Sequence, residues 1–443
     1  MHTIKENKIQ QPKFSEAFRF WFILGWISFG GTTGHVTIMH DFLVEKKKWV
    51  SNSKFFSALN ACMILPGPEA HQLAIYLGWK LHGIKGGIIS GLFFILPSIF
   101  ILLCLSIIYA LYGNTPILTS VFDGLKPAVL AIIIFATWKV SQKSLLSFLH
   151  YFVAFSSFIC SWFLNVPTPW IIISVIFFSI IISLVSPGLM ILKKRKNEID
   201  NYENSYYVNS NTAPHKTPAK TIIKQLSVFA LLWLIPFLGV TYFLADSLFW
   251  QKLSLLFTKS AFLTIGGSYT VIPYVAGLVT SKLAWLSKTQ MVDGFALAET
   301  TPGPLVIVLS YVGFMAGLNH FNGSLLMGTL GLLTASYFTF LPNFIMIFTG
   351  APLIEKSQKN QTVQAILSLV TASVVGVIVN LAFYLGESIL FLGKMISLPN
   401  INWLALGWVL FSLFLLIRYK LNMVYLILIS LLYGLLRYFL ISI

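Results

Sequence analysis

Two Pro-Gly-Pro strings stand within otherwise apolar sequence, and each has a glutamate close to it. The first string is residues 66–68, followed by Glu69, and the second is residues 302–304, shortly after Glu299. Proline is preorganised for the first turn of a helix, where its missing N–H costs nothing. Each string therefore predicts that one helix ends and another begins inside an apolar layer. A helix start offers free N–H groups and a partial positive charge, which suit an oxyanion.

Two glycine pairs, residues 30–31 and 266–267, precede the strings and allow a backbone to approach a ligand closely. Threonines beside these segments add hydroxyl donors. A single motif of this kind is better explained by helix bending and packing, because glycine and proline are common in membrane helices. Because the glycine pair and the Pro-Gly-Pro string each occur twice, the set as a whole favours a site for a small tetrahedral anion. The predicted substrate-binding residues are Gly30, Gly31, Thr32, Pro66, Gly67, Pro68, Gly266, Gly267, Thr300, Thr301, Pro302, Gly303 and Pro304.

Ionisable side chains are expensive inside a membrane and are usually functional or paired. A glutamate could carry a coupling proton, and a lysine or histidine could balance the charge of an anion. The candidates for coupling or countercharge are Glu69, Glu299, Lys259, His35 and His71. Further ionisable residues in apolar stretches are Asp123, Lys126 and Asp293. The structural alternative is that Lys259 extends to the membrane surface and that Asp123 and Lys126 lie at an interface.

The chain shows no signature of a metal centre, a cofactor or an enzyme active site. Its three cysteines lie in apolar segments without ligand spacing. Neither a Walker A motif nor an HExxH motif occurs. We therefore expect no catalytic residue, no metal and no cofactor, with transport driven by ion gradients or the membrane potential. A membrane enzyme or a scaffold is the weaker alternative, since neither a reactive residue pair nor a partner-binding soluble region is evident.

The composition is that of an integral membrane protein. Of 443 residues, 57% are hydrophobic and 10% are charged, whereas a soluble domain carries about 25% charged residues. The net charge of +16 lies in short runs between apolar stretches, as cations do at a cytoplasmic leaflet. Nucleic acid is therefore not expected as a partner. We predict an all-α polytopic membrane protein with about 10 to 13 transmembrane segments, some broken by glycine and proline.

The chain divides into two homologous repeats. The glycine pair, a Trp-Val/Leu-Ser loop beginning at Trp49 and the Pro-Gly-Pro string all recur 236 residues later, as from Gly30 to Gly266. Beyond them the register drifts, and Leu96-Pro97 matches Leu341-Pro342. The predicted domains are a cytoplasmic tail at 1–13, a first repeat at 14–192, a cytoplasmic linker at 193–223 and a second repeat at 224–443.

The loop charges favour inverted repeats. Four lysines surround the first Trp loop, at positions 46, 47, 48 and 54, whereas the second loop has only Lys282 and Lys288. Transporters built from repeats place the substrate at the repeat interface near the bilayer midplane. Strings of glycines four residues apart, at 83, 87 and 91 and at 313 and 317, predict helix-packing seams.

These motifs resemble the chromate ion transporter family of the long-chain, two-domain type. The resemblance rests on LGWISFGGTTGHVTIMHDFLV (24–44) and LNACMILPGPEAHQLAIYLGW (59–79) in the first half. In the second half it rests on TKSAFLTIGGSYTVI (258–272) and DGFALAETTPGPL (293–305). Two departures bear on substrate preference: Thr32 stands where members commonly have Pro, and His71 where Gln is usual.

The resemblance implies a multi-pass transporter of the inner membrane that exports chromate and confers chromate resistance. It also implies that the two Pro-Gly-Pro motifs, their glutamates and the glycine pairs are functional. A transporter of another oxyanion, such as sulfate, on the same fold is the alternative. The expected partners are the small oxyanion, the lipid bilayer and, as an assembly to be tested, a second copy of the chain.

Overall fold

The computed structural model describes residues 11–186, 205–209, 218–265, 267–350, 361–391 and 398–441. Over these ranges the secondary structure is helical apart from two isolated β-bridges. Seven described helices are long and apolar enough to cross a membrane, and three shorter apolar helices accompany them. Large apolar side chains stand on the outside, as at Phe148 and Phe243, which are 87% and 90% exposed. The all-α, multi-pass membrane class is confirmed.

The helices of the first half begin directly after the N-terminal tail. They are α1 (Phe14–Ile27), α2 (Gly31–His40), α3 (Asn52–Ile64), α4 (Glu69–Tyr112), α5 (Pro116–Ser144), α6 (Phe148–Trp162) and α7 (Thr168–Val185). Helix α8 (Ala219–Phe243) follows the linker and takes up the last residues of the predicted linker range. The boundary predicted at residue 193 lies outside the described residues.

The second half repeats the element order of the first. Its helices are α9 (Ser247–Leu263), α10 (Ser268–Gly277), α11 (Lys288–Glu299), α12 (Val308–His320), α13 (Leu325–Ile345), α15 (Gln361–Leu390), α16 (Trp403–Arg418) and α17 (Met423–Ile441). Even the irregular segments match, because one π-helix follows α2 at Asp41–Lys46 and another follows α10 at Leu278–Lys282. Helix α8 is the extra element between the two halves.

Helix α4 is two helices joined by a break. His82 and Gly83 leave helical geometry, and Gly83 has a φ of 62°. The arms, residues 69–81 and 84–112, fold back on each other, since a Cβ on Gly78 would collide with Ser90. The prediction of a packing seam is therefore wrong at Gly83, where a Cβ would meet nothing within 4 Å. It holds at Gly87 and Gly91, which pack against phenylalanine rings of the second half.

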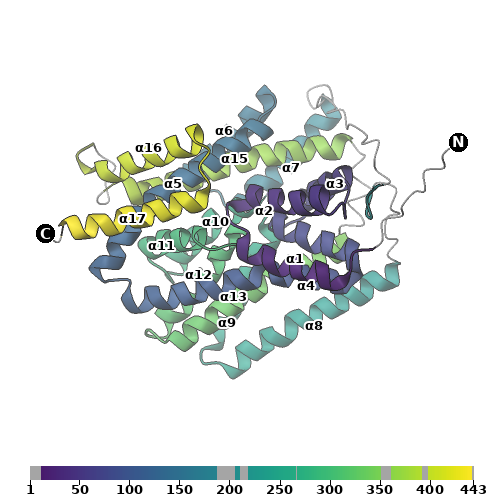
Figure 1. Cartoon of the computed structure of the whole chain (residues 1–443), viewed down its shortest axis with the longest axis horizontal. Helices are drawn as coiled ribbons and strands as arrows, with labels where there is room; N and C mark the ends of the chain where they lie inside the picture. Colours follow the sequence, from purple (N-terminus) through teal and green to yellow (C-terminus); the bar gives the residue numbers. More distant parts are fainter. Residues whose placement is uncertain are drawn as a thin grey trace.

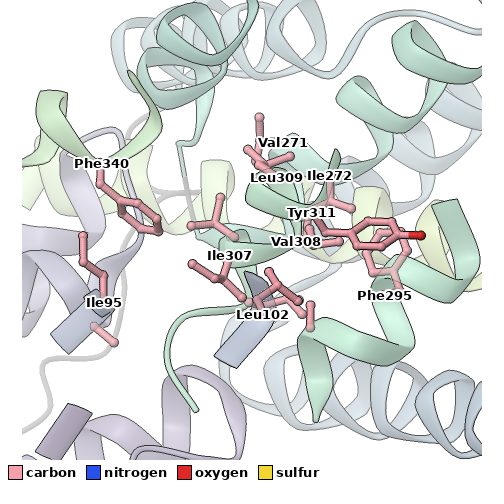
Figure 2. Close-up of a cluster of buried hydrophobic side chains, with 14 of the residues drawn as sticks. Ile95, Leu102, Val271, Ile272, Phe295, Ile307, Val308, Leu309, Tyr311 and Phe340 are labelled. Carbon is pink, nitrogen blue, oxygen red and sulfur yellow. The ribbon is translucent and has the colours of Figure 1, made fainter. Parts of the chain in front are cut away.

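The two halves interlock. Helices α6 and α7 of the first half pack on α15, and α16 and α17 of the second half pack on α5. In Figure 1, α10, α11 and α12 lie in the middle of the molecule, between α16 and α17 on the left and α1 to α3 on the right. The core lies there too: Figure 2 shows Ile95 and Leu102 of α4 beside residues 307–311, with Phe340 of α13 at one end.

The linker marks one face of the protein. Val208 forms a β-bridge with Val50, next to the lysine-rich first Trp loop, and Lys47 pairs with Glu16 in the first turn of α1 at 2.6 Å. We call this the linker face. Helix α8 begins near this face and runs along the lower right edge of the molecule in Figure 1. Its 25 residues span about 37 Å, more than the roughly 30 Å of hydrocarbon. A membrane-spanning α8 would place the start of α9 on the opposite face, which is the arrangement that the predicted inverted repeats require.

Candidate site at the crossed Pro-Gly-Pro strings

Each Pro-Gly-Pro string joins two short helices, as predicted. The first follows α3 and precedes α4, and the second follows α11 and precedes a 3₁₀ turn that leads into α12. The Gly67 N–H donates to the carbonyl of Thr264 at 2.6 Å, and the Gly303 N–H donates to the carbonyl of Ser28 at 2.7 Å. Ser28 and Thr264 are equivalent residues just before the two glycine pairs. Each string is thus bonded to the glycine break of the other repeat.

Only glycine fits at the centre of each string. Gly67 and Gly303 have φ of 133° and 100°, a region that side chains rarely adopt. A Cβ on Gly67 would collide with the side chains of Gln72 and Asn343, and one on Gly303 would collide with Ser98. The strained turn and the close packing therefore require the same residue.

Polar side chains contact the Pro-Gly-Pro strings, and two of them come from the other repeat. The Ser98 hydroxyl donates to the Pro302 carbonyl at 2.5 Å, and Asn343 takes the equivalent place beside Gly67. Ser98 and Asn343 directly follow the matched Leu-Pro pairs, so the structure confirms that pairing. Gln72 donates to the Pro66 carbonyl at 2.5 Å. Our interpretation of the sequence missed these three residues, although the positions after the Leu-Pro pairs would have indicated two of them.

Both glutamates lie at the junction of the broken helices. Glu69 begins α4 and is 8% exposed, and its Oε1 lies 2.8 Å from the place of a Cβ on Gly267. Glu299 ends α11, and its Oε1 is buried without a hydrogen-bond partner. Tyr269 interacts electrostatically with both carboxylates, and its hydroxyl lies 3.6 Å from the place of a Cβ on Gly31. The two repeats therefore share one polar region.

Tyr269 is a functional candidate that we did not predict from the sequence. Its signal was a hydroxyl-bearing ring two residues after the second glycine pair, inside an apolar stretch. Gly266 itself lies outside the described residues. Gly30 is the N-cap of α2, Gly31 and Thr32 begin the helix, and all three residues are half-buried.

The threonine hydroxyls face their own helix. Thr300 donates to the Leu297 carbonyl and Thr301 to the Ala298 carbonyl, each at 2.7 Å. These bonds close the last turn of α11, whose carbonyls lack partners within the helix. In this state the hydroxyls offer lone pairs to the junction, and a donor role toward an anion would require them to rotate.

The structure separates the predicted countercharges. The His71 ring lies between the Gly91 carbonyl, 3.1 Å from Nε2, and the Asn343 amide, 3.2 Å from Nδ1, so both nitrogens are engaged. His35 bonds the Ser28 carbonyl at 2.8 Å, and its Nδ1 is buried without a partner. Lys259 is exposed on the outer face of α9 and is not brought to the site.

Other ionisable groups form inter-helix pairs. Lys126 of α5 pairs with Asp293 of α11 at 2.7 Å, and Asp123 of α5 pairs with Arg437 of α17 at 3.6 Å. No cluster of three or more His, Cys, Asp or Glu side chains that could hold a metal ion occurs in the part of the chain that the structure describes.

Comparisons with known proteins agree with this architecture. A family model described as "Chromate transporter" matches residues 15–182 and 251–435, one segment in each half. A probable chromate transport protein of Synechococcus elongatus is 29% identical, covering 83% of this chain and 84% of its own length. A chromate transport protein of Cupriavidus metallidurans is 28% identical (82% and 80%), and an uncharacterized transporter of Methanocaldococcus jannaschii is 27% identical (97% and 96%). The comparison with solved structures finds no match.

Proposed function

The chain belongs to the chromate transporter family, and from that premise we propose that it exports chromate from the cytoplasm across the inner membrane by secondary active transport. Chromate resistance of the host cell would follow from the lower internal concentration. The observation that carries the proposal is the crossed pair of hydrogen bonds, Gly67 to Thr264 and Gly303 to Ser28. They assemble four chain breaks from the two repeats into one region, where such transporters bind their substrate.

The broken helices supply the chemistry for a tetrahedral oxyanion. Helix α4 and the turn before α12 both begin at this region, so the N–H groups of their first turns have no partner within the helix. These groups and the helix dipoles favour negative charge without a full countercharge. At Gly31 the nearest atom to the place of a Cβ is the Tyr269 hydroxyl at 3.6 Å, whereas the Glu69 carboxyl fills the corresponding place at Gly267.

The two glutamates are the proposed coupling groups. Glu69 follows the first Pro-Gly-Pro string and Glu299 precedes the second, so each half contributes one carboxyl from a different side of its string, and Tyr269 interacts with both. A buried carboxyl can bind and release a proton as water reaches it from one face and then from the other. Because the two repeats are predicted to be inverted, each glutamate would serve one face of the membrane.

The membrane potential supports the outward direction. Moving a divalent anion out of a cell with a negative interior is favourable by about 4–5 kcal/mol per 100 mV, twice the single-charge value. The lysines at 46, 47, 48 and 54 on the linker face would raise the local anion concentration at the entrance. The bilayer is the proposed environment of the exposed apolar faces, and a homodimer remains a prediction.

The test is chromate efflux from preloaded cells that carry the wild type, Glu69→Gln or Glu299→Gln. We expect the wild type to lower internal chromate, and each variant to lose this activity while its level in the membrane is unchanged. Glu387→Gln is the matched control, because Glu387 is a half-exposed glutamate that pairs with Lys288 outside the junction. A wild type that exports no chromate but changes sulfate flux would assign the machinery to another oxyanion.

A further inference from the structure

A buried ion pair connects the two halves of the molecule. The Lys126 ammonium of α5 lies 2.7 Å from Oδ1 of Asp293 on α11, and the side chains are only 18% and 6% exposed. The described ion pairs Lys47–Glu16 and Lys288–Glu387 have side chains that are 36–43% exposed. Lys126 is therefore a cation held inside the protein, where charge is expensive.

The pair has further polar and aromatic contacts. The Tyr109 hydroxyl donates to Oδ2 of Asp293 at 2.7 Å, and the ammonium of Lys126 lies 5.8 Å from the centre of the Phe122 ring. The Tyr311 ring meets Tyr109 edge-on. Figure 2 shows Tyr311 at the border of the apolar cluster, with its oxygen at the outer end of the ring. Oδ2 of Asp293 therefore accepts a hydrogen bond, whereas Oδ1 faces the Lys126 ammonium as an ion pair without a hydrogen bond.

The ion pair has no charged counterpart at the repeat-equivalent positions. The residue equivalent to Asp293 is Ser57, 236 positions earlier, and the residue equivalent to Lys126 is Thr371, in the register of the matched Leu-Pro pairs. Helix α5 packs on α11, whereas α3 and α15, which carry Ser57 and Thr371, are not among the helix pairs that pack extensively on each other. A buried ion pair is also no more stabilising than well-packed apolar residues of similar size. A role other than folding explains why charges are kept there.

The pair lies between the junction and the face opposite the linker. Asp293 comes five residues after the start of α11 and six residues before Glu299, which is about 9 Å along the helix from that glutamate. The predicted cation Lys259 is outside, and both nitrogens of His71 are engaged. Among the described ion pairs, Lys126–Asp293 is the most buried, and its acid lies on the helix that ends at Glu299.

We propose that Lys126 is the cation that binds the transported oxyanion, and that Asp293 occupies its place when no substrate is present. This inference rests on the proposed function. The oxyanion displaces the Asp293 carboxylate from Lys126 and accepts hydrogen bonds from the ammonium. The Tyr109 hydroxyl stays bonded to Asp293 and keeps that side chain satisfied during the exchange. Only a dianion that outcompetes a carboxylate opens the pair, which favours chromate and sulfate over chloride.

The first test replaces both charges by apolar side chains in the full-length protein. Lys126→Met/Asp293→Leu leaves no unpaired charge, so a structural role predicts normal thermal stability and normal transport. Our inference predicts normal stability but a chromate dissociation constant raised at least 30-fold, measured by titration of the purified protein. A double variant that is stable and binds chromate like the wild type would overturn the inference.

The second test removes only the charge of Asp293, which in our inference competes with the oxyanion for Lys126. In Asp293→Asn the amide still accepts from Tyr109, and chromate no longer competes with a carboxylate, so we expect the dissociation constant to fall at least fivefold. An unchanged or raised constant in a folded Asp293→Asn protein would contradict the exchange. Asp123→Asn/Arg437→Gln is the matched control, one turn away on α5, and should change nothing.

Binding measurements on the wild-type protein distinguish a failure of this inference from a failure of the proposed function. Wild-type binding of chromate together with unchanged binding in the apolar double variant removes the role of Lys126 and leaves the function in place. If the wild type binds sulfate instead, the same variants titrated with sulfate decide the role of Lys126. A wild type that binds no tetrahedral oxyanion overturns both.

Discussion

Replacing Gly303 by alanine tests the crossed junction directly, because the structure separates two contributions to the cost. The first is backbone strain, since a φ of 100° is unfavourable for alanine by about 1–3 kcal/mol. The second is steric: the new Cβ would push the Ser98 hydroxyl away from the Pro302 carbonyl, to which it donates at 2.5 Å. Leaving a buried carbonyl without its donor costs about 1–3 kcal/mol more. Together the substitution should destabilise the protein by roughly 2–6 kcal/mol.

Gly323→Ala measures the strain alone. Gly323 has a φ of 85° in the loop between α12 and α13, and a Cβ there meets nothing within 4 Å. Its substitution should therefore cost only about 1–3 kcal/mol. The assay is thermal unfolding of the purified protein in detergent, with chromate efflux measured in parallel. Gly303→Ala should have the lower midpoint and should also lose transport, whereas Gly323→Ala should still transport.

A double variant tests the assignment of the steric contribution to Ser98. In Gly303→Ala/Ser98→Ala the colliding hydroxyl is absent, so the loss of stability should be smaller than the sum of the two single losses, by about 0.5–3 kcal/mol. Equal midpoints for Gly303→Ala and Gly323→Ala, or strictly additive losses in the double variant, would refute the reasoning about the junction.

Three further predictions follow from other contacts. Gly91→Leu should destabilise the protein strongly and reduce its level in the membrane, because a Cβ at Gly91 already overlaps the Phe344 ring; membrane fractionation checks this. Tyr269→Phe should keep the fold but slow efflux and shift its pH dependence, and a wild-type pH profile would exclude the role. The pKa of Asp246, between α8 and α9, is lowered by its hydrogen bonds to His320 and to the start of α9. The stabilising effect of Asp246 should be lost as the pH falls through that lowered pKa. Backbone hydrogen exchange between the end of α8 and the start of α9 should therefore increase in acid in the wild type and much less in Asp246→Asn.

The sequence alone determined the class of the protein and its duplication. Apolar stretches of membrane length and a low charge content leave few other solutions, because unsatisfied polar groups are not tolerated in lipid. The constant spacing from Gly30 to Gly266 and from Gly67 to Gly303 identified equivalent breaks. Proline and glycine act on the local backbone, so their positions predicted where helices end without knowledge of any distant contact.

The tertiary structure decided which groups meet at the site. Ser98 and Pro302 are 204 residues apart, and Tyr109 and Asp293 are 184 apart, so no local periodicity relates them. The sequence also could not show that Lys259 faces outward while Lys126 faces Asp293. In an almost uniformly apolar chain, both faces of a helix look alike, because lipid and protein core accept the same side chains. Which face is buried is set by the interlocking of the two repeats, and that interlocking decides which charges lie inside.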